Sequence, residues 1–541
     1  MKYFNIQPKN NLSATVSYLL PRTLAIGLFL GAFLLLYLPL SAQPGTIIWE
    51  NNYGGSDEDF ASSVQQTDDG GYIVAGSSES ADGDVSGNSG DEDYWVMKLD
   101  ASGNILWEGN YGGSGIDLAG SVQQTDDGGY IVAGSSESDD GDVSGNNGSF
   151  DYWLVKLDSS GTILWEGNYG GGGLDEASSV QQTDDGGYIV AGSSLSAGGD
   201  LSGNNGFSDY WLVKLDVSGI IQWENNYGGS NRERARSVQQ TDDGGYIVAG
   251  LSRSDDGDVS GNNGVTDYWL VKLDTSGNIL WEGNYGGSNG DEAKSVQQTD
   301  DGGYIVAGTS ISDDGDVSGN NGTVDYWLVK LDASGTILWE GNYGGSDFDV
   351  ASSVQQTDDG GYIVAGMSFS NDGDVSGNNG FSDYWLLKLD SSGIILWEGN
   401  YGGGSIDEAP SVQQTDDGGY IVAGNSSSDD GDVSGNNGQF GNDYWLVKLN
   451  GSGTTGISGN SLQGSIKLYP NPTREKVTVE LPEAIESLNA TVLDATGRKI
   501  SEEKIENTTR FQLKLGEEAG LYFVELEYAD GLKTVRKVIK E

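Results

Sequence analysis

The hydrophobic and polar positions of this chain repeat with a period of 58 residues. The segment Ser121-Val-Gln-Gln-Thr-Asp-Asp-Gly-Gly-Tyr-Ile-Val-Ala-Gly134 recurs almost unchanged, starting at Ser63, Ser179, Ser237, Ser295, Ser353 and Ser411. A fixed period of this size indicates an array of identical structural units. Most of the chain therefore belongs to one repeated architecture.

Each repeat contains four short segments that predict β-strands. In the second copy, Ser-Val-Gln-Gln-Thr and Gly-Tyr-Ile-Val-Ala-Gly are joined by Asp-Asp-Gly-Gly, which is a hairpin signal. The third strand, Asp151–Leu157, and the fourth, Ile163–Tyr169, are joined by a turn of the form Asp-x-Ser-Gly. The second and third strands are apolar on both sides, so we expect sheets packed over both of their faces. The fourth strand alternates, so one of its sides should meet water.

Four antiparallel strands per repeat are typical of the blades of a β-propeller. The Trp-Glu motif of the fourth strand also occurs seven times, but it starts one step early, at Trp49, and is missing after Leu449. The last repeat therefore lacks its own fourth strand, and residues 46–53 can supply it, which would hide the open edges. The sequence predicts an all-β, seven-bladed β-propeller closed by its N-terminal strand. A solenoid is the alternative, although it needs no such closure.

The start of the chain has the pattern of an export signal. Residues 1–42 begin basic and polar, continue through an apolar run from Leu24 to Leu38 and end on the small residue Ala42. This run of about 15 residues is shorter than the roughly 20 needed to span a bilayer. We therefore expect a signal peptide cleaved after Ala42 and no membrane insertion of the mature chain. An uncleaved anchor is the alternative.

The remaining boundaries follow from changes in composition. The propeller is expected over residues 43–450, and the Gly/Ser-rich segment 451–464 reads as a flexible linker. Residues 465–541 contain short alternating strands, such as Lys476–Leu481 and Tyr522–Glu527, which predict a small β-sandwich.

The formal net charge is -55, and nearly all of it lies on the repeats. The first 42 residues carry three basic and no acidic residues, and the segment from Ser465 carries 12 basic against 14 acidic residues. A field of this sign repels nucleic acid phosphates and anionic membrane surfaces, and it attracts cations. We expect the mature chain to bind neither nucleic acid nor membranes. We also expect it to be a monomer.

Cysteine and histidine are both absent, which excludes disulfides, Ser-His-Asp and Cys-His catalysis, and histidine-zinc sites. Carboxylates could still serve a glycoside hydrolase. However, the acids recur identically in every repeat, whereas such an active site is asymmetric. A sialidase-like site would also need arginines from several blades, and the repeats hold only Arg232, Arg234, Arg236 and Arg253, all in the fourth copy. We therefore expect no enzyme, with a carboxylate-dependent glycoside hydrolase as the less favoured alternative.

The loop between the second and third strands has the spacing of a calcium site. In the second copy Asp140, Asp142, Ser144 and Asp151 occupy positions 1, 3, 5 and 12 of a calcium loop, with Gly145 at position 6. A long turn rich in Asp, Asn, Ser and Gly is the alternative interpretation. The third copy has Gly198 at position 1, and the seventh has Gly441 at position 12. Calcium is the one cofactor that the sequence indicates, and the other candidate ligands are Asp82, Asp84, Ser86, Asp93, Asp256, Asp258, Ser260, Asp267, Asp314, Asp316, Ser318, Asp325, Asp372, Asp374, Ser376 and Asp383.

The repeats differ in three short windows: before the first strand, after the second strand, and before the third strand. In a four-stranded blade these connections emerge at the same end, and loops held on a rigid scaffold often carry recognition. The windows are rich in phenylalanine, and the fourth copy adds its arginines. Drift at unrestrained positions is the alternative. Candidate ligand-binding residues are Phe207, Arg232, Arg234, Arg236, Arg253 and Phe369.

The tail contains Leu468-Tyr-Pro-Asn-Pro472, Val492-Leu-Asp494, Gly520-Leu-Tyr-Phe-Val524 and Lys537-Val-Ile-Lys540. These motifs resemble the type A C-terminal sorting domain of the Bacteroidetes type IX secretion system. The resemblance rests chiefly on Tyr469, Pro470, Asn471, Pro472, Gly520 and Tyr522, and the repeats look like the Asp-Gly-Gly-Tyr propeller repeats of such exported proteins. The resemblance of the tail implies that the type IX machinery recognises the tail and that the tail is removed. It also implies that the protein is then released from the cell surface or attached to it.

These observations together predict a secreted or surface-displayed, non-catalytic binding or adhesion module. A glycan or a surface protein is the expected ligand class. A structural surface protein without a specific ligand is the alternative from a different functional class.

Overall fold

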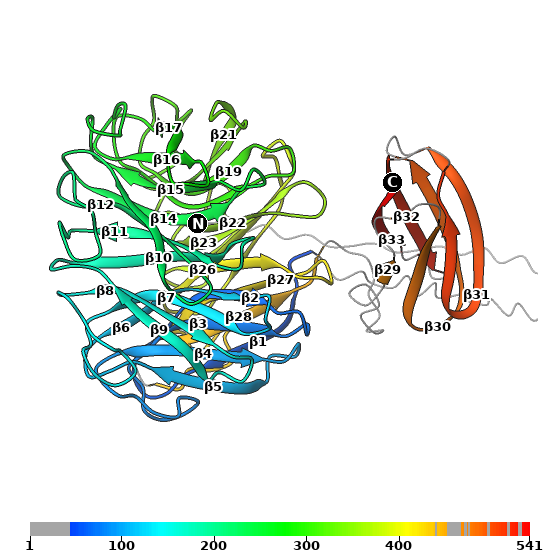
Figure 1. Ribbon diagram of the computed structural model, residues 1–541, viewed down its shortest axis with the longest axis horizontal. Coiled ribbons are helices and arrows are strands. Elements are labelled where there is room, and N and C mark those ends of the chain that lie inside the picture. Colours follow the sequence, from blue (N-terminus) through cyan, green and yellow to red (C-terminus); the bar gives the residue numbers. More distant parts are fainter. Residues whose placement is uncertain are drawn as a thin grey trace, which may run out of the picture. The chain divides into compact units, whose positions relative to one another are not determined.

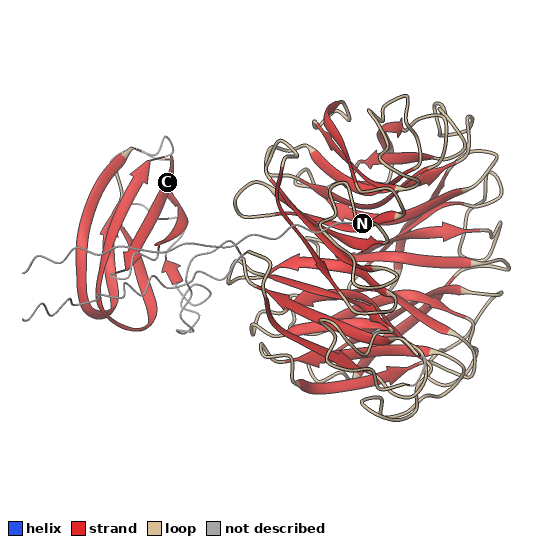
Figure 2. Ribbon diagram, turned by 180° about the vertical axis from the view of Figure 1, so that it is seen from behind, coloured by secondary structure: helices blue, strands red, loops and turns tan. Residues whose placement is uncertain are grey.

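The computed structural model describes residues 44–438, 441–451, 467–469, 473, 476–494, 498–516, 520–528 and 533–540. Every regular element within these ranges is a β-strand (Figures 1 and 2). No helix that is long and apolar enough to cross a membrane occurs in the described part of the chain. The expected all-β class is confirmed. The expected signal peptide, residues 1–42, and most of the expected linker lie outside the described residues.

The repeats form seven four-stranded antiparallel sheets. Sheet 1 contains β2 (Asp59–Gln66), β3 (Tyr72–Ser78), β4 (Asp93–Leu99) and β5 (Ile105–Tyr111). Sheet 2 contains β6 (Asp117–Gln124), β7 (Tyr130–Ser136), β8 (Asp151–Leu157) and β9 (Ile163–Tyr169). Sheet 3 contains β10 (Asp175–Gln182), β11 (Tyr188–Ser194), β12 (Asp209–Leu215) and β13 (Ile221–Tyr227). Sheet 4 contains β14 (Glu233–Gln240), β15 (Tyr246–Ser252), β16 (Asp267–Leu273) and β17 (Ile279–Tyr285). Sheet 5 contains β18 (Asp291–Gln298), β19 (Tyr304–Ser310), β20 (Asp325–Leu331) and β21 (Ile337–Tyr343). Sheet 6 contains β22 (Asp349–Gln356), β23 (Tyr362–Ser368), β24 (Asp383–Leu389) and β25 (Ile395–Tyr401).

The seventh sheet combines the two ends of the array. It contains β26 (Asp407–Gln414), β27 (Tyr420–Ser426), β28 (Asp443–Leu449) and β1 (Ile47–Tyr53), in the order β1-β28-β27-β26. β1 pairs antiparallel with β28, with Asn51 opposite Leu446. This is the pairing expected from the missing fourth strand of the last repeat.

The hydrophobic core lies between neighbouring sheets. The second and third strands are almost completely buried, because each sheet contributes apolar side chains to both of its faces. At each interface a third-strand Tyr packs on the third-strand Trp of the next sheet; Tyr94 lies 4.6 Å from Trp153 and donates a 2.9 Å hydrogen bond to its carbonyl. The contact of Tyr444 with Trp95 is the same, at 4.6 Å and 3.0 Å, so sheet 7 packs on sheet 1 as the other sheets pack on one another.

The hairpin between the first and second strands is held by side chains of the turn itself. Asp69 accepts hydrogen bonds from the Thr67 hydroxyl at 2.6 Å and from the Gly71 amide at 3.0 Å, and Gly70 takes a positive φ of 81°. The buried Lys98 of the third strand forms a 3.0 Å ion pair with the same carboxylate. The Asp-Asp-Gly-Gly turn therefore ties the hairpin to the third strand and has a structural role.

The C-terminal residues form a separate five-stranded sheet. It contains β29 (Lys467–Tyr469), β30 (Lys476–Asp494), β31 (Lys499–Lys514), β32 (Gly520–Tyr528) and β33 (Lys533–Lys540). The 19-residue β30 pairs with β29, β31 and β32, and its pairing with β31 shifts register between Glu480 and Ile485. The expected small β-sandwich stays a prediction. Val477, Val492, Leu513 and Val524 lie in its core.

Deletion of residues 43–53 should destabilise the array strongly. β1 covers the edge of β28, its Glu50 accepts a 2.8 Å hydrogen bond from the Trp445 indole, and its Trp49 packs 5.8 Å from Tyr72 of sheet 1. Truncation of one buried Trp typically costs about 3–5 kcal/mol, and loss of the whole strand should cost more. Thermal denaturation and size-exclusion chromatography would measure the loss of stability and the association through the exposed edge.

Ile48→Ser provides the control for this deletion, because that side chain on β1 is 56% exposed and should tolerate the change. A deletion variant that melts at the wild-type temperature and stays monodisperse would show that β1 does not support the seventh sheet.

Candidate ligand-binding site

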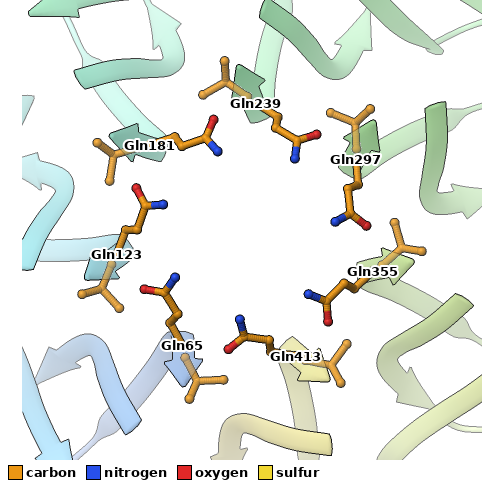
Figure 3. Close-up of a pocket in the computed structure, with 14 residues that line it drawn as sticks. Gln65, Gln123, Gln181, Gln239, Gln297, Gln355 and Gln413 are labelled. Carbon is orange, nitrogen blue, oxygen red and sulfur yellow. The ribbon is translucent and has the colours of Figure 1, made fainter. Parts of the chain in front are cut away.

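The first strands of all seven sheets surround a common cavity of about 260 Å³. Its lining consists of one Val and one Gln from each repeat, and Figure 3 shows the Gln side chains pointing into the shared space. Each Gln carbonyl oxygen accepts a hydrogen bond from a backbone amide of the next sheet; Gln65 Oε1 accepts from Gln124 N at 2.6 Å, and Gln413 Oε1 accepts from Gln66 N at 2.5 Å. These bonds turn the amide nitrogens toward the cavity (Figure 3).

The first halves of the same strands differ from one repeat to the next. Arg234 pairs with Glu176 of the preceding sheet at 3.0 Å, and Arg236 pairs with Glu292 of the following sheet at 2.6 Å. Lys294 also contacts Glu292, at 2.7 Å. Three neighbouring sheets are therefore connected by one network of half-buried charges.

The network changes the proton affinity of its members. Burial alone would raise the pKa of Glu292, but Arg236 and Lys294 outweigh it and hold the pKa below its usual range. Burial lowers the pKa of Lys294, and the neighbouring Arg236 adds to the shift.

The position that holds Glu292 is occupied by Phe60, Leu118, Val350 and Glu408 in other sheets. Burial raises the pKa of Glu408, and the ion pairs found in the described residues do not include it.

The three variable windows meet at one end of the sheets. Val324, before the third strand of sheet 5, forms a parallel bridge with Phe348, before the first strand of sheet 6. Phe369, after the second strand of sheet 6, donates a 2.8 Å backbone hydrogen bond to Phe348, and the two rings lie 6.3 Å apart. Ser208, Arg232 and Arg253 make the corresponding contacts in sheets 3 and 4. We call the surface formed by these three windows the variable face.

Large apolar side chains are exposed on the variable face. Phe207 is 63%, Phe348 50% and Phe381 70% exposed. Phe369 is half-buried against Phe348. These aromatic side chains provide contact area for a partner, since aromatic residues are enriched at recognition surfaces.

The four arginines of the fourth repeat do not act as one free basic cluster. Arg234 and Arg236 are paired with Glu176 and Glu292, and Arg253 donates a 3.0 Å hydrogen bond to the Thr266 hydroxyl. Arg232 is exposed. The sequence shows four positive charges close together, whereas the acids that neutralise two of them come from neighbouring repeats.

The candidate calcium ligands of one loop are engaged by different neighbours. Asp140 accepts a 2.7 Å hydrogen bond from the Ser114 amide, and the Ser144 amide faces Glu166 at 3.4 Å. Asp151, at position 12, is fully buried at the start of β8. Burial raises its pKa to about 6, and Asp175 and Asp200 of the next repeat add to the shift. Calcium binding within a single loop stays a prediction.

The acid that starts each third strand, at or near position 12 of the expected calcium loop, belongs to a buried pair of acids at the interface with the next sheet. Each pair joins the first residue of a third strand with the first residue of the next sheet's first strand, and all of these residues are at most 1% exposed. The pairs are Asp93 with Asp117, Asp151 with Asp175, Asp209 with Glu233, Asp267 with Asp291, Asp325 with Asp349, Asp383 with Asp407, and Asp443 with Asp59. The first-strand acids escaped the sequence analysis because their partners lie in another repeat.

The sorting motif lies in the C-terminal sheet as far as the structure describes it. Tyr469 ends β29, Gly520 begins β32, and Tyr522 is buried in the core. Pro470, Asn471 and Pro472 lie outside the described residues.

Comparison with known proteins identifies this tail. Residues 467–541 match the family model of the secretion system C-terminal sorting domain. The predicted sorting domain is therefore confirmed, and the tail directs export through the type IX secretion system to the cell surface or the extracellular space. The tail accordingly interacts with the type IX secretion machinery.

The chain is also similar, at low sequence identity, to other proteins. The regulatory protein FlaEY of Caulobacter vibrioides is 25% identical over 240 residues, which cover 40% of this chain but only 25% of that protein. A fungal alcohol oxidase of the AA5 family, in complex with copper, aligns over 92% of this chain and 100% of its own, with 12% identity and a TM-score of 0.46. A puromycin hydrolase aligns over 82% of this chain and 62% of its own, with 12% identity and a TM-score of 0.43. None of these likenesses assigns an activity to this chain.

Glu292→Gln should destabilise the protein by about 1–3 kcal/mol at neutral pH, because it leaves the half-buried Arg236 and Lys294 without a charged partner. The lowered pKa of Glu292 means that its stabilising effect is present above the usual carboxylate range and is lost as the pH falls. Chemical denaturation of the variant and the wild type at several pH values would measure both effects.

Glu408→Gln is the matched control, since it makes the same change at the same position of another repeat. The pKa of Glu408 is raised, so its removal should leave the free energy of unfolding unchanged or increase it at neutral pH. Equal destabilisation by the two substitutions would contradict a special role of the charge network.

Proposed function

We propose that the seven sheets form a closed seven-bladed β-propeller that acts as a secreted, non-catalytic binding module. The observation that carries the proposal is the variable face. The repeats are nearly identical in their strands, and their differences gather at one end of the sheets around exposed aromatic side chains.

Three contacts support closure of the ring. β1 completes the last sheet through its pairing with β28. Tyr444 and Trp95 connect sheets 7 and 1 through the packing seen at the other interfaces. Gln413 accepts from the Gln66 amide, so the hydrogen bonds around the central cavity continue from the last repeat to the first.

Exposed aromatic side chains on a rigid scaffold favour recognition over a purely structural role. Phe207, Phe348 and Phe381 belong to three different repeats and lie on backbone that is bridged to the neighbouring sheet. A bound partner would therefore meet anchors that lose little conformational freedom. Aromatic faces suit the apolar faces of sugar rings and protein surfaces alike, so a glycan or a surface protein is the proposed ligand class.

The buried acid pairs do not favour a glycoside hydrolase. Two carboxylates of such an enzyme flank the scissile bond and must reach the substrate. The acids at the interfaces between sheets are at most 1% exposed, and they recur at all seven interfaces. Hydrolysis of polysaccharides by the exported protein would nevertheless support that alternative, and failure to bind any glycan or surface protein would support a structural surface protein.

Binding of the exported protein to glycan arrays and to surface proteins would test the proposal. Once a ligand is found, the triple variant Phe207→Ser, Phe348→Ser and Phe381→Ser should weaken binding at least about tenfold, or ~1.4 kcal/mol, because the exposed aromatics provide the anchors. Isothermal titration calorimetry would measure the change in affinity.

The chain offers a matched control in Leu106→Ser, Leu164→Ser and Leu280→Ser. These leucines are exposed to 57–58% but lie on the fourth strands β5, β9 and β17, away from the variable windows. If the leucine variant loses affinity and the phenylalanine variant keeps it, the ligand binds elsewhere.

A further inference from the structure

The buried acid pair between sheets 5 and 6 shows the geometry of these sites in detail. Asp325 begins β20, Asp349 begins β22, and both are fully buried. Gly344 lies between them: a Cβ on this glycine would be 2.6 Å from Asp325 Oδ1 and 2.6 Å from Asp349 Oδ2. The two carboxylates therefore face one small space that only glycine leaves open.

Part of this pair has no partner in the protein. Asp325 Oδ2 accepts a 2.5 Å hydrogen bond from the Asn321 amide, and Asp349 Oδ2 accepts from the Gly345 amide at 2.7 Å and the Ser370 hydroxyl at 2.9 Å. Asp325 Oδ1, which faces the space beside Gly344, is buried and accepts no hydrogen bond. None of the ion pairs found in the described residues reaches either carboxylate. Burial of a carboxylate oxygen without a hydrogen-bond partner is costly, so Asp325 Oδ1 is available for a ligand from outside the chain.

A surface pocket is lined by residues that contact the pair. Asn321, Gly345, Ser346, Asp372 and Asp374 line it, and it thus includes the residues whose amides hold the two buried carboxylates. Asp374 also links the pocket to the buried acids, because its Oδ2 accepts a 3.3 Å hydrogen bond from the amide of Gly344, the glycine that lies between them.

We propose that each interface between sheets binds one hard divalent cation of the calcium type, held between a third-strand acid and the first-strand acid of the next sheet. Calcium takes six to eight oxygens from carboxylates, carbonyls and water, so a pair of carboxylates suffices only with such additional ligands. This requirement agrees with the finding that no group of three or more acidic side chains in the described residues could hold a metal alone.

This arrangement differs from a calcium loop within one repeat, and it does not depend on the proposed ligand binding. Its ligands come from two neighbouring sheets, so the cation would connect the repeats. The first-strand acids, which lie outside the loops, become essential. The third repeat, which has Gly198 at the first position of the loop, keeps a complete acid pair in Asp209 and Glu233.

Calcium titration of the EDTA-treated exported protein by isothermal titration calorimetry tests the proposal. We expect up to seven equivalents and a melting temperature that rises with calcium and falls again with EDTA. Asp349→Asn should remove one equivalent, although Asp349 lies outside the calcium loops. Asp358→Asn is the matched control, because it removes the same charge at an exposed hairpin position and should keep all equivalents.

Asp374→Asn at the mouth of the pocket provides a second variant if Asp349→Asn fails to fold, and it should weaken one equivalent. The absence of calcium binding to the wild type, or full stoichiometry in Asp349→Asn, would overturn the proposal. A free energy of unfolding that falls as the pH rises through about 6, without calcium binding, would instead show that the pairs share protons.

Discussion

Each sheet of the repeat array has two apolar faces, and this constraint determines the rest of the structure. The second and third strands are buried on both sides, so no sheet can be stable without a neighbour on each side. The Tyr–Trp contact between third strands satisfies this need at every interface, including the one between the last sheet and the first. The buried second and third strands are therefore nearly identical from repeat to repeat, and the repeats differ mainly in the variable windows and in the first strands.

The sequence predicted the strands of each copy and the strand that completes the last sheet, but it missed the side-chain contacts that join two copies. Period, alternation and turn residues were enough for the four strands, and the missing fourth strand after Leu449 predicted the pairing of β1 with β28. The loop spacing assigned Asp151 to the acids of its own repeat, whereas the structure places it near Asp175 and Asp200. Likewise, Arg234 and Arg236 looked like a free basic patch because Glu176 and Glu292 are 58 residues away from Arg234 on either side. Contacts between repeats depend on the packing of whole sheets, which residue spacing does not reveal.

Many side-chain contacts are the same in every sheet, whereas a few side chains differ from one repeat to the next. Near the cavity, identical glutamines bond to the next sheet, and the buried Lys98 and its equivalents hold each hairpin. The charge network of Arg236, Glu292 and Lys294 and the exposed phenylalanines depart from the repeat pattern. The proposed recognition of one partner requires such departures.

The pairing of β1 with β28 also has a kinetic meaning. Glu50 and Trp445 meet although 395 residues separate them, whereas Glu108 and Trp95 make the same contact across 13 residues. Contacts of such different range form at very different rates, because a long loop must first be closed. The hairpins can form as soon as each repeat is available, but the seventh sheet must wait for both ends of the array. We therefore expect the pairing of β1 with β28 to be the slow final step of folding. Before it, a long-lived intermediate would have six complete sheets and one open edge.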